Sequence, residues 1–179
     1  MTTNEPVSEK NLDGYDAPLI PWAKVRELLA EGLTEAPGTG GPDRHTGWLT
    51  TIDADGAPHV VPVGVLFDGG SIYFNAGPAT RKAKNIAYDG RCAITVATHP
   101  FDLVFEGEVL KLTDDARVQH VAQLFVDQGW PATARGGALY AEYSAPSAGP
   151  PPWHAYEMTP ATVYAFGAAE PFGATRWTF

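Results

Sequence analysis

Three runs of strand-forming residues separated by tight turns fill residues 48–75, and they constrain the fold more than any other part of the chain. The runs are residues 48–53, 59–67 and 71–75. Asp55-Gly56 separates the first two runs, and Asp68-Gly69-Gly70 separates the last two. Turns this short join antiparallel neighbours. The segment therefore predicts a three-stranded meander and disfavours a parallel sheet, whose strands need helical crossovers.

Further strands and helices are expected around this meander. Apolar and β-branched runs predict strands over residues 92–97, 103–112 and 156–166. Apolar residues at helical spacing predict helices over 22–31, 80–88 and 114–126. The pattern as a whole predicts a mainly β fold of six antiparallel strands with peripheral helices. A small barrel is the favoured arrangement, because closing the sheet removes its open edges.

Glycine, proline and polar residues mark the less regular parts of the chain. Residues 1–20 show no periodicity, and we expect an arm that is disordered or lies on a partner chain, followed by one domain over 21–179. Residues 128–152 are rich in Gly, Pro, Ala and Ser. A long irregular segment inside a compact domain is often functional, so this loop is expected to shape a substrate pocket.

Charge and residue counts exclude several classes of function. The net charge is −9, from 21 acidic and 12 basic residues, which argues against a nucleic-acid or anionic-membrane binder. The single cysteine excludes a disulfide within the chain, and the five histidines show no zinc-like spacing, so no metal site is expected. The chain lacks a signal pattern and an apolar run of about 18 residues, so a soluble cytoplasmic protein is expected.

Basic residues at a helix start are the strongest sign of a binding site. Arg81, Lys82 and Lys84 lie in the first turn or so of the helix predicted to begin at Thr80. The helix N-terminus carries a partial positive charge, so cations there are unfavourable unless an anion binds. Backbone N–H groups, the Thr80 hydroxyl and the basic side chains would converge on a phosphate. The alternative is a solvated basic patch.

The segment 74–85, with Thr80-Arg81-Lys82 at its centre, resembles the pyridoxamine 5′-phosphate oxidase family and its flavin and deazaflavin oxidoreductase relatives. The hairpin over 51–63 and the later strand around Phe105 resemble that family as well. The resemblance implies a split β-barrel of the FMN-binding type, in which the Thr80-Arg81-Lys82 triplet binds the FMN phosphate. It also implies a homodimer with the cofactor at the interface and a flavin-dependent oxidoreductase acting on a small organic substrate.

Further site residues follow from the same resemblance. Strand backbone would line the flavin ring at Val60, Val61, Pro62 and Val63, and Asn75 would lie near the ribityl chain. Arg176 and Trp177 would either cover the cofactor of the partner's site or make a dimer contact. No catalytic acid or base is assigned, because the flavin itself performs hydride transfer.

The sequence leaves the cofactor and the substrate open. The family's basic residue on the second strand and its Arg-Leu-Ala-Pro ending are absent, so pyridoxamine phosphate oxidation itself is not expected. Thr80-Arg81-Lys82 suits both FMN and the deazaflavin F420. Arg44 and Lys84 would suit the acidic tail of F420, whereas the net charge of −9 favours FMN. A non-catalytic flavin-binding or storage protein is the third possibility.

Overall fold

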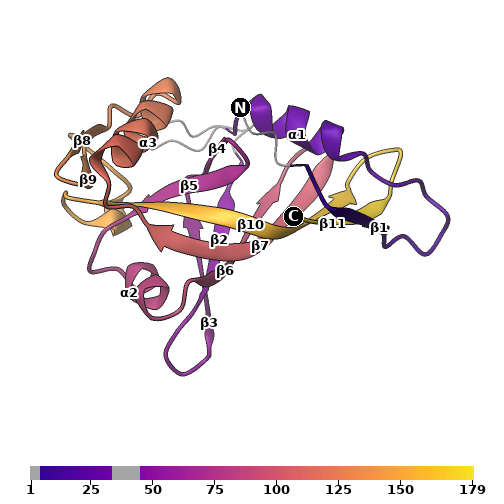
Figure 1. The fold of residues 1–179 in the computed structure, drawn as a ribbon, viewed down its shortest axis with the longest axis horizontal. Helices are drawn as coiled ribbons and strands as arrows, with labels where there is room; N and C mark the ends of the chain where they lie inside the picture. The colour runs from indigo at the N-terminus through magenta and orange to yellow at the C-terminus, as the bar shows by residue number, and fades with distance from the viewer. Residues whose placement is uncertain (1–4, 34–44) are drawn as a thin grey trace.

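A computed structural model describes residues 5–33 and 45–179, and within them the fold is mainly β with three α-helices (Figure 1). The helices are α1 (Trp22–Ala30), α2 (Arg81–Tyr88) and α3 (Asp115–Asp127). The strands are β1 (Ser8–Asn11), β2 (Gly47–Ile52), β3 (Pro58–Val63), β4 (Leu66–Asp68), β5 (Ser71–Ala76), β6 (Arg91–Ala97), β7 (Phe101–Lys111), β8 (Thr133–Arg135), β9 (Ala138–Tyr140), β10 (His154–Gly167) and β11 (Ala174–Thr178). The expected mainly β class with peripheral helices is confirmed.

One antiparallel sheet holds most of these strands, and strand β10 is its branch point. The strand order is β1-β11-β10-β7-β6-β2-β3. Strand β10 pairs with β7 from Tyr156 to Gly167, with β5 at residues 154–158 and with β11 at residues 162–166. The register with β7 shifts between Pro160 and Thr162, where the partner on the other edge of β10 changes from β5 to β11. The bulge therefore lies where the sheet divides.

The expected meander over residues 48–75 is partly wrong. The β2–β3 and β4–β5 hairpins form as predicted. The run 59–67, however, breaks into β3 and β4, and β5 pairs with β10 rather than with β3. Val65 is the physical reason: it turns into the core, is 1% exposed, and packs so closely on Gly47 that a Cβ there would lie 2.7 Å from Val65 Cγ1.

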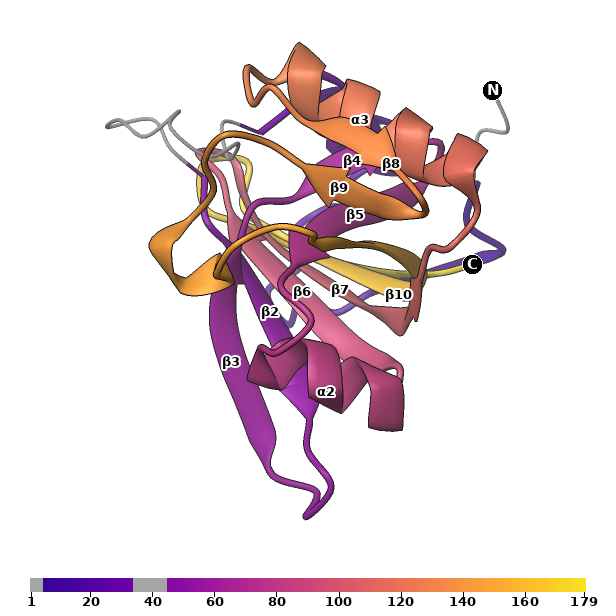
Figure 2. The ribbon, with the colours of Figure 1, turned by 90° about the vertical axis from the view of Figure 1, so that its left-hand side faces the viewer.

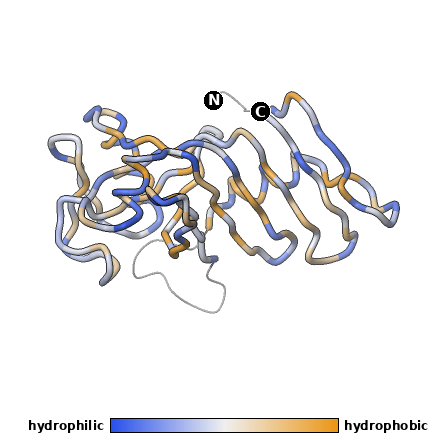
Figure 3. The backbone as a smooth tube through the Cα atoms, turned by 90° about the horizontal axis from the view of Figure 1, so that it is seen from below, coloured by the Kyte–Doolittle hydropathy of each residue, from blue (hydrophilic) through white to orange (hydrophobic). Residues whose placement is uncertain are grey.

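Two hydrophobic clusters stabilise the chain. The larger one fills one face of the sheet beneath α1 and α2 and includes Phe74, Phe105 and Trp177. The smaller one lies between α3, the β8–β9 hairpin and the start of β10, around Trp130 and Trp153 (Figure 2). Along several strands hydrophobic and hydrophilic residues alternate, as expected for strands with one buried face (Figure 3).

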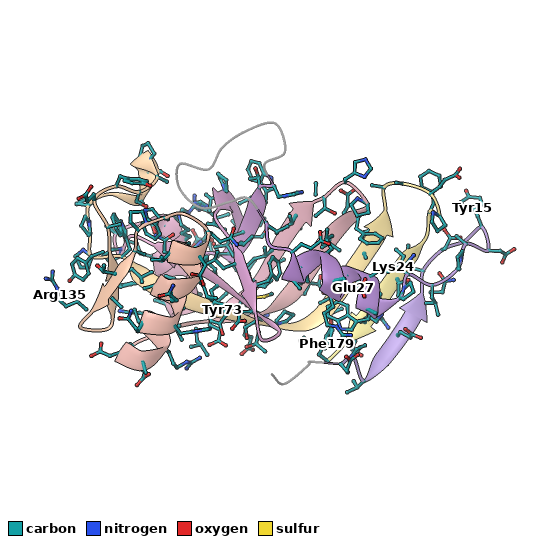
Figure 4. The ribbon with its side chains drawn as sticks, turned by 90° about the horizontal axis from the view of Figure 1, so that it is seen from above. Tyr15, Lys24, Glu27, Tyr73, Arg135 and Phe179 are labelled. Atoms are coloured by element: carbon teal, nitrogen blue, oxygen red, sulfur yellow. The ribbon has the colours of Figure 1, made fainter. Side chains whose placement is uncertain are left out.

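The N-terminal segment is more ordered than its sequence predicts. The arm was expected to be disordered or to lie on a partner chain, but β1 pairs with β11 of the same chain, with Ser8 opposite Thr178. Helix α1 covers this end of the sheet. Its Trp22 ring packs 5.4 Å from Trp177 and 5.0 Å from Phe179, which lies beside the helix (Figure 4).

The Gly- and Pro-rich segment 128–152 is also more regular than expected. It contains the β8–β9 hairpin and a single 3₁₀ turn, η1 (Pro146–Ala148). Trp130 is fully buried and donates its indole N–H to the Tyr143 carbonyl at 2.7 Å. Two buried tryptophans thus hold a segment whose composition alone suggested an irregular loop. None of the described helices is long and apolar enough to span a membrane.

Candidate functional site

The start of α2 is built as the sequence predicts. Thr80 is the N-cap: its hydroxyl accepts from the Ala83 N–H at 3.4 Å and donates to the Gly77 carbonyl at 2.7 Å. The helix then runs over Arg81–Tyr88 with no acidic residue in its first turn. The Thr80 hydroxyl takes up the Ala83 N–H, whereas the N–H groups of Arg81 and Lys82 have no partner within the helix, and the helix dipole makes this end electropositive.

Lys82 is a half-buried cation in this first turn. Removal of its ammonium from water lowers the pKa of Lys82, and no opposing charge offsets the effect. No carboxylate of the described residues forms an ion pair with it. A partly buried charge is costly unless it is paired. The arrangement therefore suits a bound anion at the start of α2.

Arg81 is the outer cation of the same turn and already has a partner. Its guanidinium forms an ion pair with Asp53, at the end of the β2–β3 hairpin. The Arg81 side chain is 59% exposed, whereas that of Asp53 is 16% exposed. The hydrogen bond from Arg81 holds the pKa of Asp53 below its usual value. The sequence did not predict this contact.

Two further contacts fix α2 in place. Asn85 is buried and donates to the Thr51 hydroxyl at 3.0 Å, which ties the helix to β2. Gly77 lies so close to η1 that a Cβ there would be 2.0 Å from the Ala148 carbonyl oxygen. The turn before α2 therefore requires glycine and brings part of the 128–152 segment next to Thr80.

The four predicted residues of β3 lie at the end of the sheet order. Val60 is 55% exposed and Pro62 is exposed, whereas Val63 is buried and Val61 is partly buried against the larger cluster. Among the described strands β3 pairs with β2 alone, so one edge of its backbone has no strand neighbour. The hairpin reaches beyond the rest of the sheet at the end where α2 lies (Figures 1 and 2).

Asn75 lies at the end of β5, five residues before Thr80. Its Nδ2 is buried and has no hydrogen-bond partner in the described residues. A buried amide without a partner costs free energy, so a ligand oxygen at this position would be favourable.

The two predicted residues of the C-terminal tail lie elsewhere. Arg176 is partly exposed on β11, where it neighbours Tyr164. Trp177 is fully buried against Trp22, so its ring has no exposed surface to offer a cofactor or a partner chain. In the strand order β10, β7, β6 and β2 separate β11 from β3. The structure thus places Thr80, Arg81 and Lys82 at the start of α2, with Asn75 on the strand that leads to it, and leaves the tail apart.

Arg44, the second residue suggested for an acidic tail, lies outside the described residues, whereas Lys84 is exposed on α2. Sequence reasoning missed Asp53 and the η1 turn as neighbours of the site. Asp53 was visible only as part of a hairpin turn, and nothing in the sequence linked it to Arg81.

Comparison with known proteins identifies the type of chain. The family model described as pyridoxamine 5′-phosphate oxidase matches residues 39–167, well over half of the chain. This range includes the β2–β3 hairpin, α2 and all of β10. No curated protein sequence matches the chain.

Solved structures share the fold at low sequence identity. A conserved hypothetical protein of Mycobacterium tuberculosis superposes with a TM-score of 0.59 and 13% identity, over 85% of this chain and 88% of that one. PhzG of Burkholderia lata, solved with tetrahydrophenazine-1-carboxylic acid, superposes with a TM-score of 0.58 and 13% identity, over 92% of this chain and 89% of that one. General Stress Protein 26 of Bacillus anthracis superposes with a TM-score of 0.50 and 13% identity, over 79% of this chain and 92% of that one.

Proposed function

Because the chain belongs to the pyridoxamine 5′-phosphate oxidase family, we propose that it is an FMN-binding oxidoreductase that acts on a small organic substrate. The observation that carries this proposal is the half-buried Lys82 ammonium, which has no carboxylate partner in the described residues. It lies at the start of α2, where the helix N-terminus favours an anion. A terminal phosphate satisfies both requirements.

The residues around α2 fit such a cofactor in three respects. Arg81 and Lys82 supply donors for the phosphate, while the Thr80 hydroxyl caps the helix by bonding Gly77 and Ala83. Asn75 supplies a buried donor that lacks an acceptor, which suits a ribityl or ring oxygen. The free edge of β3 at Val60–Val63 offers backbone groups to the ring edge. The bound flavin would supply the redox chemistry, and the chain's task is to hold it and limit its contact with water.

The purified protein tests the proposal directly. We expect a yellow protein with a flavin absorbance spectrum, or a colourless one that binds added FMN much more tightly than riboflavin, which lacks the phosphate. Reduction of the bound flavin by a nicotinamide donor would support an oxidoreductase. A protein that binds F420 instead would overturn the choice of cofactor, and FMN bound without reduction by any donor would point to a storage role.

We also propose that the protein is a homodimer that uses the outer face of the sheet. Trp48 is 46% exposed, Val60 55% and Phe166 40%. The strand register places all three on the face opposite the larger cluster. Exposed aromatic and apolar residues gathered on one face are typical of an interface. Val60 is also part of the proposed cofactor site, so the two surfaces adjoin.

Replacing Trp48 with alanine is expected to raise the dimer dissociation constant roughly 30- to 1,000-fold, because a two-fold interface loses two tryptophans at about 1–2 kcal/mol each. Light scattering across a dilution series measures the change. Tyr15→Ala serves as the matched control, since Tyr15 is an aromatic residue that is 96% exposed in the N-terminal segment. A monomeric wild-type protein, or an equal effect of both variants, would contradict the proposed interface.

A further inference from the structure

The two prolines of β3 fall on the same edge of the strand. In an antiparallel ladder, directly opposite residues alternate between pairs that exchange two hydrogen bonds and pairs that exchange none. Pro58, Val60 and Pro62 occupy alternate positions opposite β2. Because proline has no N–H to exchange, these three residues belong to pairs of the second kind, and their backbone groups face away from β2. In agreement, the intervening His59 turns its carbonyl toward β2, where it accepts from the Thr51 hydroxyl at 3.5 Å.

The outward edge of β3 is therefore poor in hydrogen-bond donors. Three outward-facing residues of an ordinary strand would offer three N–H groups and three carbonyls. Of the three residues on this edge, only Val60 has an N–H. No other strand of the described residues pairs with this edge, and β3 is the last strand at its end of the sheet order (Figure 2).

The side chains of β3 would otherwise favour the addition of another strand. Three of its six residues are valine, and none is Asp, Glu, Lys or Arg. Val60 is 55% exposed. An uncharged, β-branched edge is a ready template for pairing with another chain unless something blocks it. At the other end of the sheet order, β1 has only four residues and carries the charges of Glu9 and Lys10, which protect an edge in a different way.

We propose that Pro58 and Pro62 prevent a second copy of this chain from adding to the sheet at β3. In a two-fold antiparallel pairing, Val60 would lie opposite the partner's Val60, and each Pro58 would lie opposite a Pro62. Three N–H donors from each strand would make six hydrogen bonds, but the two prolines of each strand remove four of them. Four carbonyls would then be covered without a donor, which is unfavourable. Copies of the chain are left to meet through the outer face of the sheet.

The double variant Pro58→Ala/Pro62→Ala tests this directly, because it restores the missing N–H groups without adding a large apolar side chain. Each restored hydrogen bond should strengthen association roughly two- to tenfold. We therefore expect self-association through this edge to be roughly 30- to 10,000-fold stronger than in the wild type. Sedimentation velocity across a dilution series should show larger species than the wild type forms, and these should dissociate on dilution.

The single variants and a matched control separate edge pairing from misfolding. Pro58→Ala and Pro62→Ala each restore two of the four bonds, so each should strengthen association by roughly five- to 100-fold. Pro146→Ala removes an exposed proline from η1, away from any sheet edge, and should leave the size distribution unchanged. Variants of β3 that match the wild type at every concentration, or an equal increase in Pro146→Ala, would overturn the inference.

Discussion

Replacing Lys82 with alanine is expected to weaken FMN binding by ~1.5–3 kcal/mol, or roughly 10- to 150-fold, the range for hydrogen bonds to charged groups. The half-buried ammonium has no carboxylate partner in the described residues, so its charge is fully available to the ligand. Arg81→Ala should give a loss at the lower end of the same range, because its exposed guanidinium is shared with Asp53. Fluorescence titration with FMN measures both.

Two comparisons separate a phosphate contact from a general disturbance. Riboflavin should bind the variants and the wild type equally well, because it lacks the group that Lys82 holds. Lys84→Ala removes an exposed cation from the same helix and should change FMN affinity by less than about 1 kcal/mol. If FMN affinity is unchanged in both Lys82→Ala and Arg81→Ala, the start of α2 is not a phosphate site.

Replacing Trp130 with alanine should lower the free energy of unfolding by ~3–5 kcal/mol, the usual cost of deleting a buried tryptophan side chain. Trp130 is fully buried, packs edge-on against Phe125 at 4.8 Å and lies 5.6 Å from the Trp153 ring. The substitution also leaves the Tyr143 carbonyl without its indole donor. Urea unfolding followed by circular dichroism gives the free energy.

Trp130→Phe distinguishes packing from hydrogen bonding, because it keeps an aromatic ring but loses the indole N–H. A loss of about 1–2 kcal/mol is expected for this variant, from the hydrogen bond and the smaller ring. A loss below about 1 kcal/mol in Trp130→Ala would mean that the 128–152 segment does not depend on its tryptophans. The two buried rings would then need another explanation.

Local signals predicted the parts of the site that depend on neighbouring residues. The Thr80 N-cap and the basic first turn of α2 lie within a few residues of each other, so the helix start could be recognised from residues 74–85. The turns at Asp55-Gly56 and Gly69-Gly70 likewise predicted two hairpins, and both formed. Short-range geometry fixes these features before any tertiary contact is known.

Features that depend on distant residues could not be predicted in this way. Asp53 and Arg81 are 28 residues apart, and only the packing of α2 on β2 brings them together. Whether the Trp177 ring is buried depends on which face of β11 is turned toward the core, and the sequence pattern of so short a strand does not decide that. The Gly and Pro content of residues 128–152 predicts an irregular segment, but it carries no information on how Trp130 and Trp153 pack.

The forked pairing of β10 makes the two hydrophobic clusters one cooperative unit. Ala155 belongs to the smaller cluster, while Met158 and Val163, a few residues along the same strand, belong to the larger one. Neither cluster can open without breaking strand pairing that the other depends on, so partial unfolding that opens only one of the two clusters is disfavoured. Heating should therefore unfold both clusters in a single transition, without an intermediate that keeps one of them folded.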